Sequence, residues 1–95
     1  MSNNLDEQIV SSVGDPAHIA EVIIDALVRD LKFGPGDFVY EKTVSVAFTL
    51  WGFTAEDILA GLSFAKQQRW LLFDPDLLTY TLTQVGISRS KEAEI

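Results

Sequence analysis

The hydrophobic period of this chain changes from helical to strand-like near residue 70. Before that point, segments 16–32 and 54–69 place apolar residues at intervals of three and four, which is typical of helices that bury one stripe. After it, a short apolar run is followed by a turn and then by apolar residues at every second position, which is typical of a hairpin. A chain of 95 residues has room for one domain. The pattern therefore predicts a small α+β domain.

The first helix has clear start and stop signals. Asp15 can cap free backbone N–H groups, and Pro16 suits the first helical position because no donor is needed there. Gly34 can adopt a positive φ and Pro35 cannot continue a helix, so we expect the helix to stop at this point. The expected apolar stripe comprises Ile19, Ala20, Ile23, Ile24, Leu27, Val28 and Leu31.

The segment from residue 43 to residue 52 fits two structures. Its apolar residues alternate with small and polar ones between Thr43 and Leu50, which indicates a strand. The same segment places Val44, Ala47, Phe48 and Trp51 at helical spacing. The local pattern alone slightly favours the strand.

The second helix is expected over residues 54–69. Thr54 is a good N-cap, and Glu56 and Asp57 lie at the positive end of the helix dipole. Asp57 only approximates the Glu or Gln of a capping box. The expected inward stripe comprises Ile58, Leu59, Leu62 and Ala65.

A hairpin is expected after this helix. Residues 70–73 are apolar, and Asp74-Pro75-Asp76 fits a type I turn. Leu78, Tyr80 and Leu82 then alternate with threonines, which indicates a half-buried strand.

Two runs of the chain are Leu59-x-x-Leu62 leading to Trp70-Leu71, and Tyr80-Thr81-Leu82-Thr83-x-x-Gly86. They resemble the winged helix-turn-helix family of transcription regulators, including the multiple-antibiotic-resistance and phenolic-acid-repressor types. The resemblance covers residues 16–86. It implies a small winged helix with three helices and a small antiparallel sheet that includes a wing hairpin. It also favours a helix over 43–52, a turn at Gly52-Phe53, and a recognition-helix role for 54–69.

The charge pattern argues against DNA binding, even though the chain resembles a family of DNA-binding proteins. Recognition helices present base-reading side chains to the major groove, yet of the expected outward residues only Gln67 is of that kind. Asp74 and Asp76 occupy the expected wing tip, residues 36–86 hold six acids against three bases, and the net charge of −7 repels phosphate. We therefore expect a protein-interaction or regulatory module that binds a protein partner or forms a homodimer. The candidate interaction face comprises Glu56, Ala60, Ser63, Phe64 and Gln67.

A DNA-binding transcriptional regulator is the alternative, using helix 54–69 and the hairpin over 70–83. Its expected DNA contacts are Lys42, Ser63, Lys66, Gln67 and Arg69. A dimer that gathers Lys42, Lys66 and Arg69 into one patch would favour this alternative.

Catalytic, metal and cofactor sites are not expected. His18 is the single histidine and the chain has no cysteine, so no set of metal ligands or nucleophilic triad has suitable spacing. Phe53 and Phe64 are expected in the core, with exposure in an apolar patch as the alternative.

The predicted domain covers residues 15–87. We expect 88–95 to be a loose tail and 1–14 to be a flexible segment, with an amphipathic helix as the alternative for 1–14. Without a signal sequence, a membrane span or cysteine, we expect a cytoplasmic protein that does not bind membranes.

Overall fold

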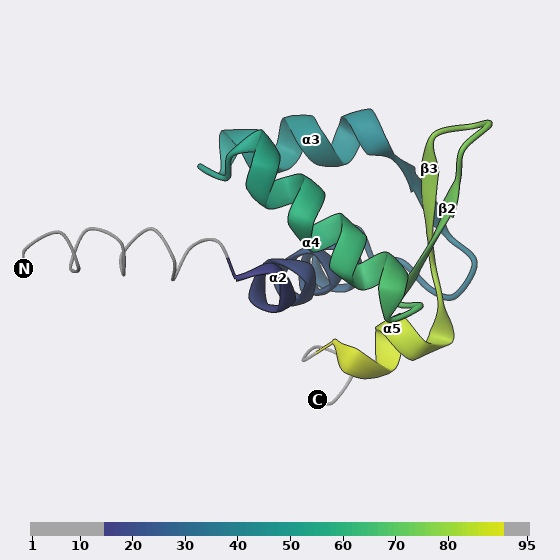
Figure 1. The fold of residues 1–95 in the computed structure, drawn as a ribbon. Coiled ribbons are helices and arrows are strands. Elements are labelled where there is room, and N and C mark those ends of the chain that lie inside the picture. The colour runs from purple at the N-terminus through teal and green to yellow at the C-terminus, as the bar shows by residue number, and fades with distance from the viewer. Residues whose placement is uncertain (1–14, 91–95) are drawn as a thin grey trace, which may run out of the picture.

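The computed structural model describes residues 15–90, which form four helices and a three-stranded antiparallel sheet (Figure 1). The α+β class predicted from the hydrophobic pattern is confirmed. The predicted flexible segment 1–14 and residues 91–95 lie outside the described residues. In chain order the elements are α2 (Pro16–Arg29), β1 (Phe38–Tyr40), α3 (Glu41–Leu50), α4 (Ala55–Gln67), β2 (Leu71–Asp74), β3 (Thr79–Leu82) and α5 (Gln84–Arg89).

Helix α2 begins as predicted and ends earlier than predicted. The Asp15 carboxylate accepts a hydrogen bond from the Ala17 N–H at 3.1 Å, so the expected cap is present. Beyond the helix, Lys32 takes a left-handed φ of 58°, and the Phe33 N–H donates to the Leu27 carbonyl at 3.0 Å. Leu31, predicted in the apolar stripe, therefore lies outside the helix and is exposed. The predicted members of the stripe that are buried are Ile19, Ala20, Ile23, Ile24 and Leu27.

Residues 43–50 are helical and belong to α3, so the helix favoured by the resemblance is confirmed. Val44 and Phe48 are buried one turn apart, whereas Val46 and Leu50 are exposed. A strand would have placed all four side chains on one face. Trp51, predicted on the inward stripe, follows the last turn of the helix and is half exposed.

Helix α4 starts with a complete capping box. The Thr54 hydroxyl accepts from the Asp57 N–H at 3.1 Å, and the Asp57 carboxylate accepts from the Thr54 N–H at 3.4 Å. Ile58, Leu62 and Ala65 are buried as predicted, whereas the inward placement predicted for Leu59 is wrong because this side chain is exposed.

Gly61 sets the distance between α4 and α2. A Cβ atom at this position would lie 2.5 Å from Ile19 Cγ2 and 3.2 Å from the backbone nitrogen of Ala20. The two helices therefore approach more closely than a larger residue would allow.

The sheet has the strand order β1-β3-β2. Strand β3 pairs with both neighbours, so Tyr80 lies opposite Val39 on one side and Phe73 on the other. This inner row faces the helices, and its side chains include buried Val39 and Tyr80. The adjacent outer row places exposed Phe38 and Leu72 on either side of Thr81. The predicted hairpin is present, but its loop is wider than a two-residue turn.

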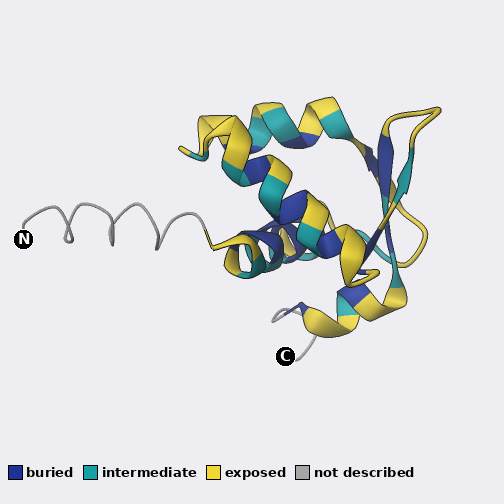
Figure 2. Ribbon diagram, in the orientation of Figure 1, coloured by how far each residue is buried: buried dark blue, intermediate teal, exposed yellow. Residues whose placement is uncertain are grey.

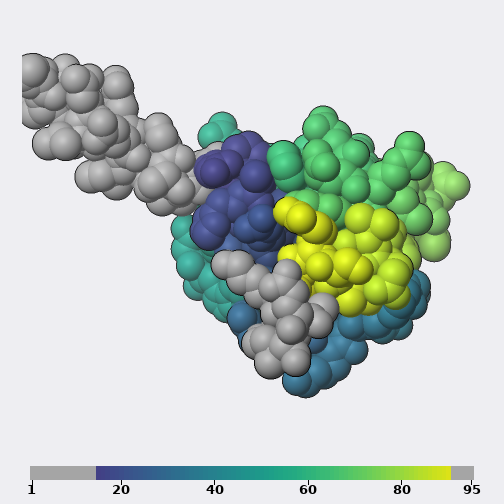
Figure 3. Space-filling view, turned by 90° about the horizontal axis from the view of Figure 1, so that it is seen from below, coloured from purple at the N-terminus to yellow at the C-terminus, as the bar shows by residue number. Residues whose placement is uncertain are grey.

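Helix α5 extends past residue 87, where we expected the domain to end and a loose tail to begin. The Thr83 hydroxyl accepts from the Gly86 N–H at 3.0 Å and starts a six-residue helix that the sequence analysis did not predict. Ser90 is buried, and its hydroxyl donates to the Asp25 carboxylate at 3.0 Å. Seen from below, α5 closes the underside next to α2 (Figure 3). Residues 88–90 therefore belong to the folded domain.

Buried residues lie on the faces of α2, α3, α4 and the sheet that turn toward one another (Figure 2). None of the helices between residues 15 and 90 is long and apolar enough to cross a membrane.

Candidate interaction surface

A groove of about 630 Å³ lies between α3, α4 and the loop that joins β2 to β3. Three separate elements contribute large apolar side chains to it, and each of these side chains is more than half exposed: Tyr40 (55%), Leu59 (55%), Leu77 (63%) and Leu78 (53%). We call this hollow the helix–hairpin groove. Its lining comprises Tyr40, Glu41, Lys42, Thr43, Ser45, Ala55, Leu59, Leu77 and Leu78.

Helix α4 places Leu59 in the groove because of the position of its buried stripe. Ile58 and Leu62 lie one turn apart and point into the core. Leu59 is rotated by about 100° from Ile58 around the helix axis, so it leaves the core face. Ala55 lies one turn before Leu59 and lines the same groove with a small side chain.

The loop of residues 75–78 presents two further leucines. The Asp74 carboxylate accepts hydrogen bonds from the backbone N–H groups of Asp76 at 2.9 Å and Leu77 at 3.2 Å. The Leu78 N–H donates to the Asp74 carbonyl at 2.7 Å, which makes a longer loop than the predicted turn. Leu78 has a left-handed φ of 56°, which is unfavourable for a residue with a Cβ.

The loop is joined directly to the start of α3. The Glu41 N–H donates to the Leu78 carbonyl at 2.9 Å. This bond satisfies one of the free donors at the beginning of the helix, where Tyr40 provides no side-chain cap. The apolar loop is therefore held against the side of the groove that α3 provides.

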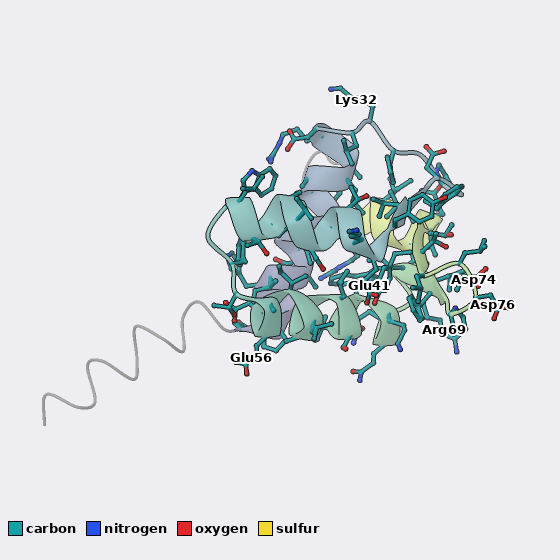
Figure 4. All side chains as sticks on the ribbon, turned by 90° about the horizontal axis from the view of Figure 1, so that it is seen from above. Lys32, Glu41, Glu56, Arg69, Asp74 and Asp76 are labelled. Carbon is teal, nitrogen blue, oxygen red and sulfur yellow. The ribbon has the colours of Figure 1, made fainter. Side chains whose placement is uncertain are left out.

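Glu41 is a half-buried carboxylate in this largely apolar setting. It makes no salt bridge with any residue of the described part of the chain. Burial raises the pKa of the Tyr80 phenol above its ordinary value, and the negative charge of Glu41 raises that pKa further. In Figure 4, Glu41 lies between α3 and α4, whereas Glu56 and the pair Asp74 and Asp76 lie toward opposite ends of the view. Of these four acids, only Glu41 lines the helix–hairpin groove.

The predicted interaction face lies along α4 beside the groove. Glu56, Ser63 and Gln67 are exposed, whereas Ala60 and Phe64 are half-buried. None of the five lines the helix–hairpin groove, so their role in binding stays a prediction. Phe64 instead packs on Trp70, with ring centroids 5.6 Å apart, and lines a second hollow of about 420 Å³. Phe53 is also half-buried, with its ring centroid 5.8 Å from that of Phe48.

The three bases proposed for DNA contacts occupy two places. Lys42 lies in the first turn of α3 and lines the groove. Lys66 lies near the end of α4, with its ammonium 5.6 Å from the centre of the Phe73 ring, and exposed Arg69 follows the helix.

Among the described residues, no three His, Cys, Asp or Glu side chains are grouped so that they could hold a metal ion.

Comparison with family models, curated proteins and solved structures gives no match for this chain. What the chain binds must therefore be inferred from the geometry and charge of its own surface.

The four apolar residues that define the groove were not predicted to form a surface. Leu59 was counted with the buried stripe, and Leu78 with the half-buried strand. Leu77 and Leu78 carried a signal of a binding surface, because turn formation does not require two adjacent leucines. Their meeting with Leu59 depends on tertiary packing and has no local pattern.

Proposed function

We propose that this chain is a winged-helix-like module that binds a protein segment in the helix–hairpin groove and performs no catalysis. The order helix, strand, helix, helix, strand, strand supports the winged-helix part of this proposal. The small antiparallel sheet that ends in a hairpin supports it as well.

The apolar lining of the groove carries the proposal of protein binding. Tyr40, Leu59, Leu77 and Leu78 come from three elements and leave a continuous hollow open to solvent. Small domains seldom expose such a patch unless it binds something. A small ligand is generally enclosed on most sides, whereas an open groove with exposed walls suits a chain segment that covers them.

The charges favour a protein over a nucleic acid. Duplex binding requires bases that neutralise neighbouring phosphates. In this chain Lys42 lies on α3, Lys66 lies on α4 and Arg69 follows α4, and the net charge is −7. Apolar contact with a protein segment needs no such cluster of bases.

A selection from a library of random short peptides tests the proposal. The full chain is the bait, and L59D is the bait for counter-selection. We expect peptides that bind the natural chain and lose at least about tenfold in affinity for L59D, because an apolar contact is lost and a charge is placed in the groove.

The matched control is L72D. Leu72 is exposed to a similar extent, 53%, but lies on the outer row of the sheet and does not line the groove. The selected peptides should bind L72D as they bind the natural chain. The proposal is wrong if no peptide distinguishes the natural chain from L59D, or if L59D and L72D weaken binding equally.

The same protein is titrated with duplex DNA at low salt. We expect no binding. Affinity for the duplex that falls steeply with added salt and is lost on replacing Lys66 and Arg69 with Gln would instead establish the DNA-binding alternative.

A further inference from the structure

We infer that the segment bound in the helix–hairpin groove is cationic and amphipathic, with a Lys or Arg that pairs with Glu41 and apolar side chains that cover Leu59, Leu77 and Leu78. This inference rests on the proposed function and specifies the chemistry of the partner. The presence of Glu41 in the lining of the groove, together with these three leucines, is the observation that leads to it.

The backbone of Glu41 is held at the start of α3. Glu41 is the first residue of this helix, and its N–H donates to the Leu78 carbonyl at 2.9 Å. A carboxylate in the first turn interacts favourably with the helix dipole. That interaction explains an acid at this position, but it does not neutralise the charge within the groove. Lys42, the next residue, also lines the groove but forms no salt bridge with Glu41.

Binding of an apolar segment would remove water from Glu41. An ionised carboxylate that loses water without gaining a partner raises the free energy of the complex. A neutral segment would therefore bind against this cost, and an acidic segment would add repulsion. A segment with a suitably placed cation would replace the lost water by a charge-assisted hydrogen bond.

The charges around the groove favour the same partner. Asp76 is exposed in the loop that carries Leu77, and Glu56 is exposed next to Ala55. Together with the net charge of −7, these acids attract a basic segment and repel an acidic one. The influence of Glu41 on the pKa of Tyr80 indicates that its charge acts on neighbouring groups in this part of the molecule.

A second copy of this chain suits the groove less well. Each copy carries the charge of −7, so two copies repel one another at long range. Sedimentation of the full chain at low and high salt tests this occupant. A dimer that dissociates in L59D would overturn the inference of a basic partner.

The test uses the peptides selected against the natural chain. We expect at least one Lys or Arg within reach of apolar residues in the enriched sequences, at a frequency above that of the unselected library. The best binder should lose about five- to tenfold in affinity for E41Q, in the range measured for charge pairs at interfaces. Binding to E41Q should also depend less on salt.

The matched control for E41Q is E21Q. Glu21 is likewise a half-buried glutamate on a helix, but it lines the second hollow and not the groove. E21Q should leave the peptide affinity within a factor of about two, as expected for a distant surface charge. E41Q also alters the first turn of α3, so a further experiment exchanges the charges of the chain and the peptide. E41K should recover affinity for a peptide whose basic residue is replaced by Glu.

The outcomes separate the two proposals. Selected peptides that depend on Leu59 but show no basic enrichment and no loss with E41Q would overturn the inference and leave the proposed function intact. Failure of the charge exchange to restore any affinity would overturn the inference in the same way. Absence of any peptide that depends on Leu59 would overturn both.

Discussion

Leu78 combines a strained backbone with an exposed apolar side chain in the groove. Its φ of 56° lies in the left-handed region, which costs a residue with a Cβ roughly 1–2 kcal/mol. A glycine at this position would avoid that cost, and an exposed leucine gains little from burial. Strain of this kind is often found where a side chain serves in binding.

We predict that L78G raises the free energy of unfolding by about 0.5 kcal/mol while it weakens peptide binding, because relief of strain exceeds the entropy cost of glycine. Urea denaturation and peptide titration measure the two effects. L77G is the control, since Leu77 is exposed in the same loop without a positive φ. L77G should lower stability by about 0.5–1 kcal/mol. Equal destabilisation by L78G and L77G would show that the backbone of Leu78 is not strained.

Tyr80 makes stability depend on pH in the alkaline range. Its pKa is raised in the folded protein, chiefly by burial and also by Glu41, so the folded state retains the phenolic proton more strongly than the unfolded state does. The resulting stability is fully present below the unfolded pKa of about 10 and is lost as pH rises above it, by at most about 1.4 kcal/mol per pH unit.

Urea denaturation between neutral pH and pH of about 11 measures this decline. Y80F should remove the part of the decline that belongs to Tyr80, whereas Y40F retains Tyr80 and should retain that part. A decline that is identical in Y80F and in the natural chain would show that Tyr80 does not cause it.

At the scale of elements, the close contact of α2 with α4 depends on Gly61. We predict that G61A lowers the free energy of unfolding by about 1–3 kcal/mol, because the new Cβ would meet Ile19 and the backbone of Ala20. The better helix propensity of alanine recovers only part of this loss.

S63A is the control for G61A, since Ser63 is exposed on the same helix. S63A should change stability by no more than about 0.5 kcal/mol. Stabilisation by G61A, as in an exposed helix, would mean that α2 and α4 do not approach so closely.

Local signals explain which elements could be predicted. The Asp15 and Thr54 caps and the alternation around Tyr80 fixed the helix starts and the hairpin, because each depends on neighbours in sequence. The sequence of residues 43–50 fits both the helical and the strand period. The helix forms because Val44 and Phe48 are then buried against other elements. Helix α5 has six residues, too few to give a clear period, and depends on contacts with α2.

For the molecule as a whole, the net charge and the class of fold follow from sequence, but the binding surface does not. The groove forms because the loop of 75–78 meets the start of α3 and one face of α4. No pattern within a single segment of the sequence predicts that these three parts of the chain lie together. The predicted face on α4 therefore lies beside the groove and does not line it.

The acids should limit nucleic-acid binding by the whole surface. Asp74 accepts two backbone hydrogen bonds in the loop, so its replacement would disturb the turn. We predict that E56K combined with D76K creates weak duplex binding at low salt that falls as salt is added, because two acids become bases. Fluorescence anisotropy with labelled duplex measures this.

The neutral pair E56Q and D76N serves as the control and should bind duplex less than the lysine pair. If the lysine pair gains no affinity even at low ionic strength, the acids are not what prevents DNA binding.

Amide chemical-shift mapping of the full chain during titration with a selected peptide tests most directly whether the helix–hairpin groove is a protein-binding surface. We predict that the largest shifts occur at residues 40–45, Ala55, Leu59, Leu77 and Leu78, and that they disappear in L59D. Shifts that cluster around Lys66 and Arg69, appear with duplex DNA rather than with peptide, and persist in L59D would contradict the account.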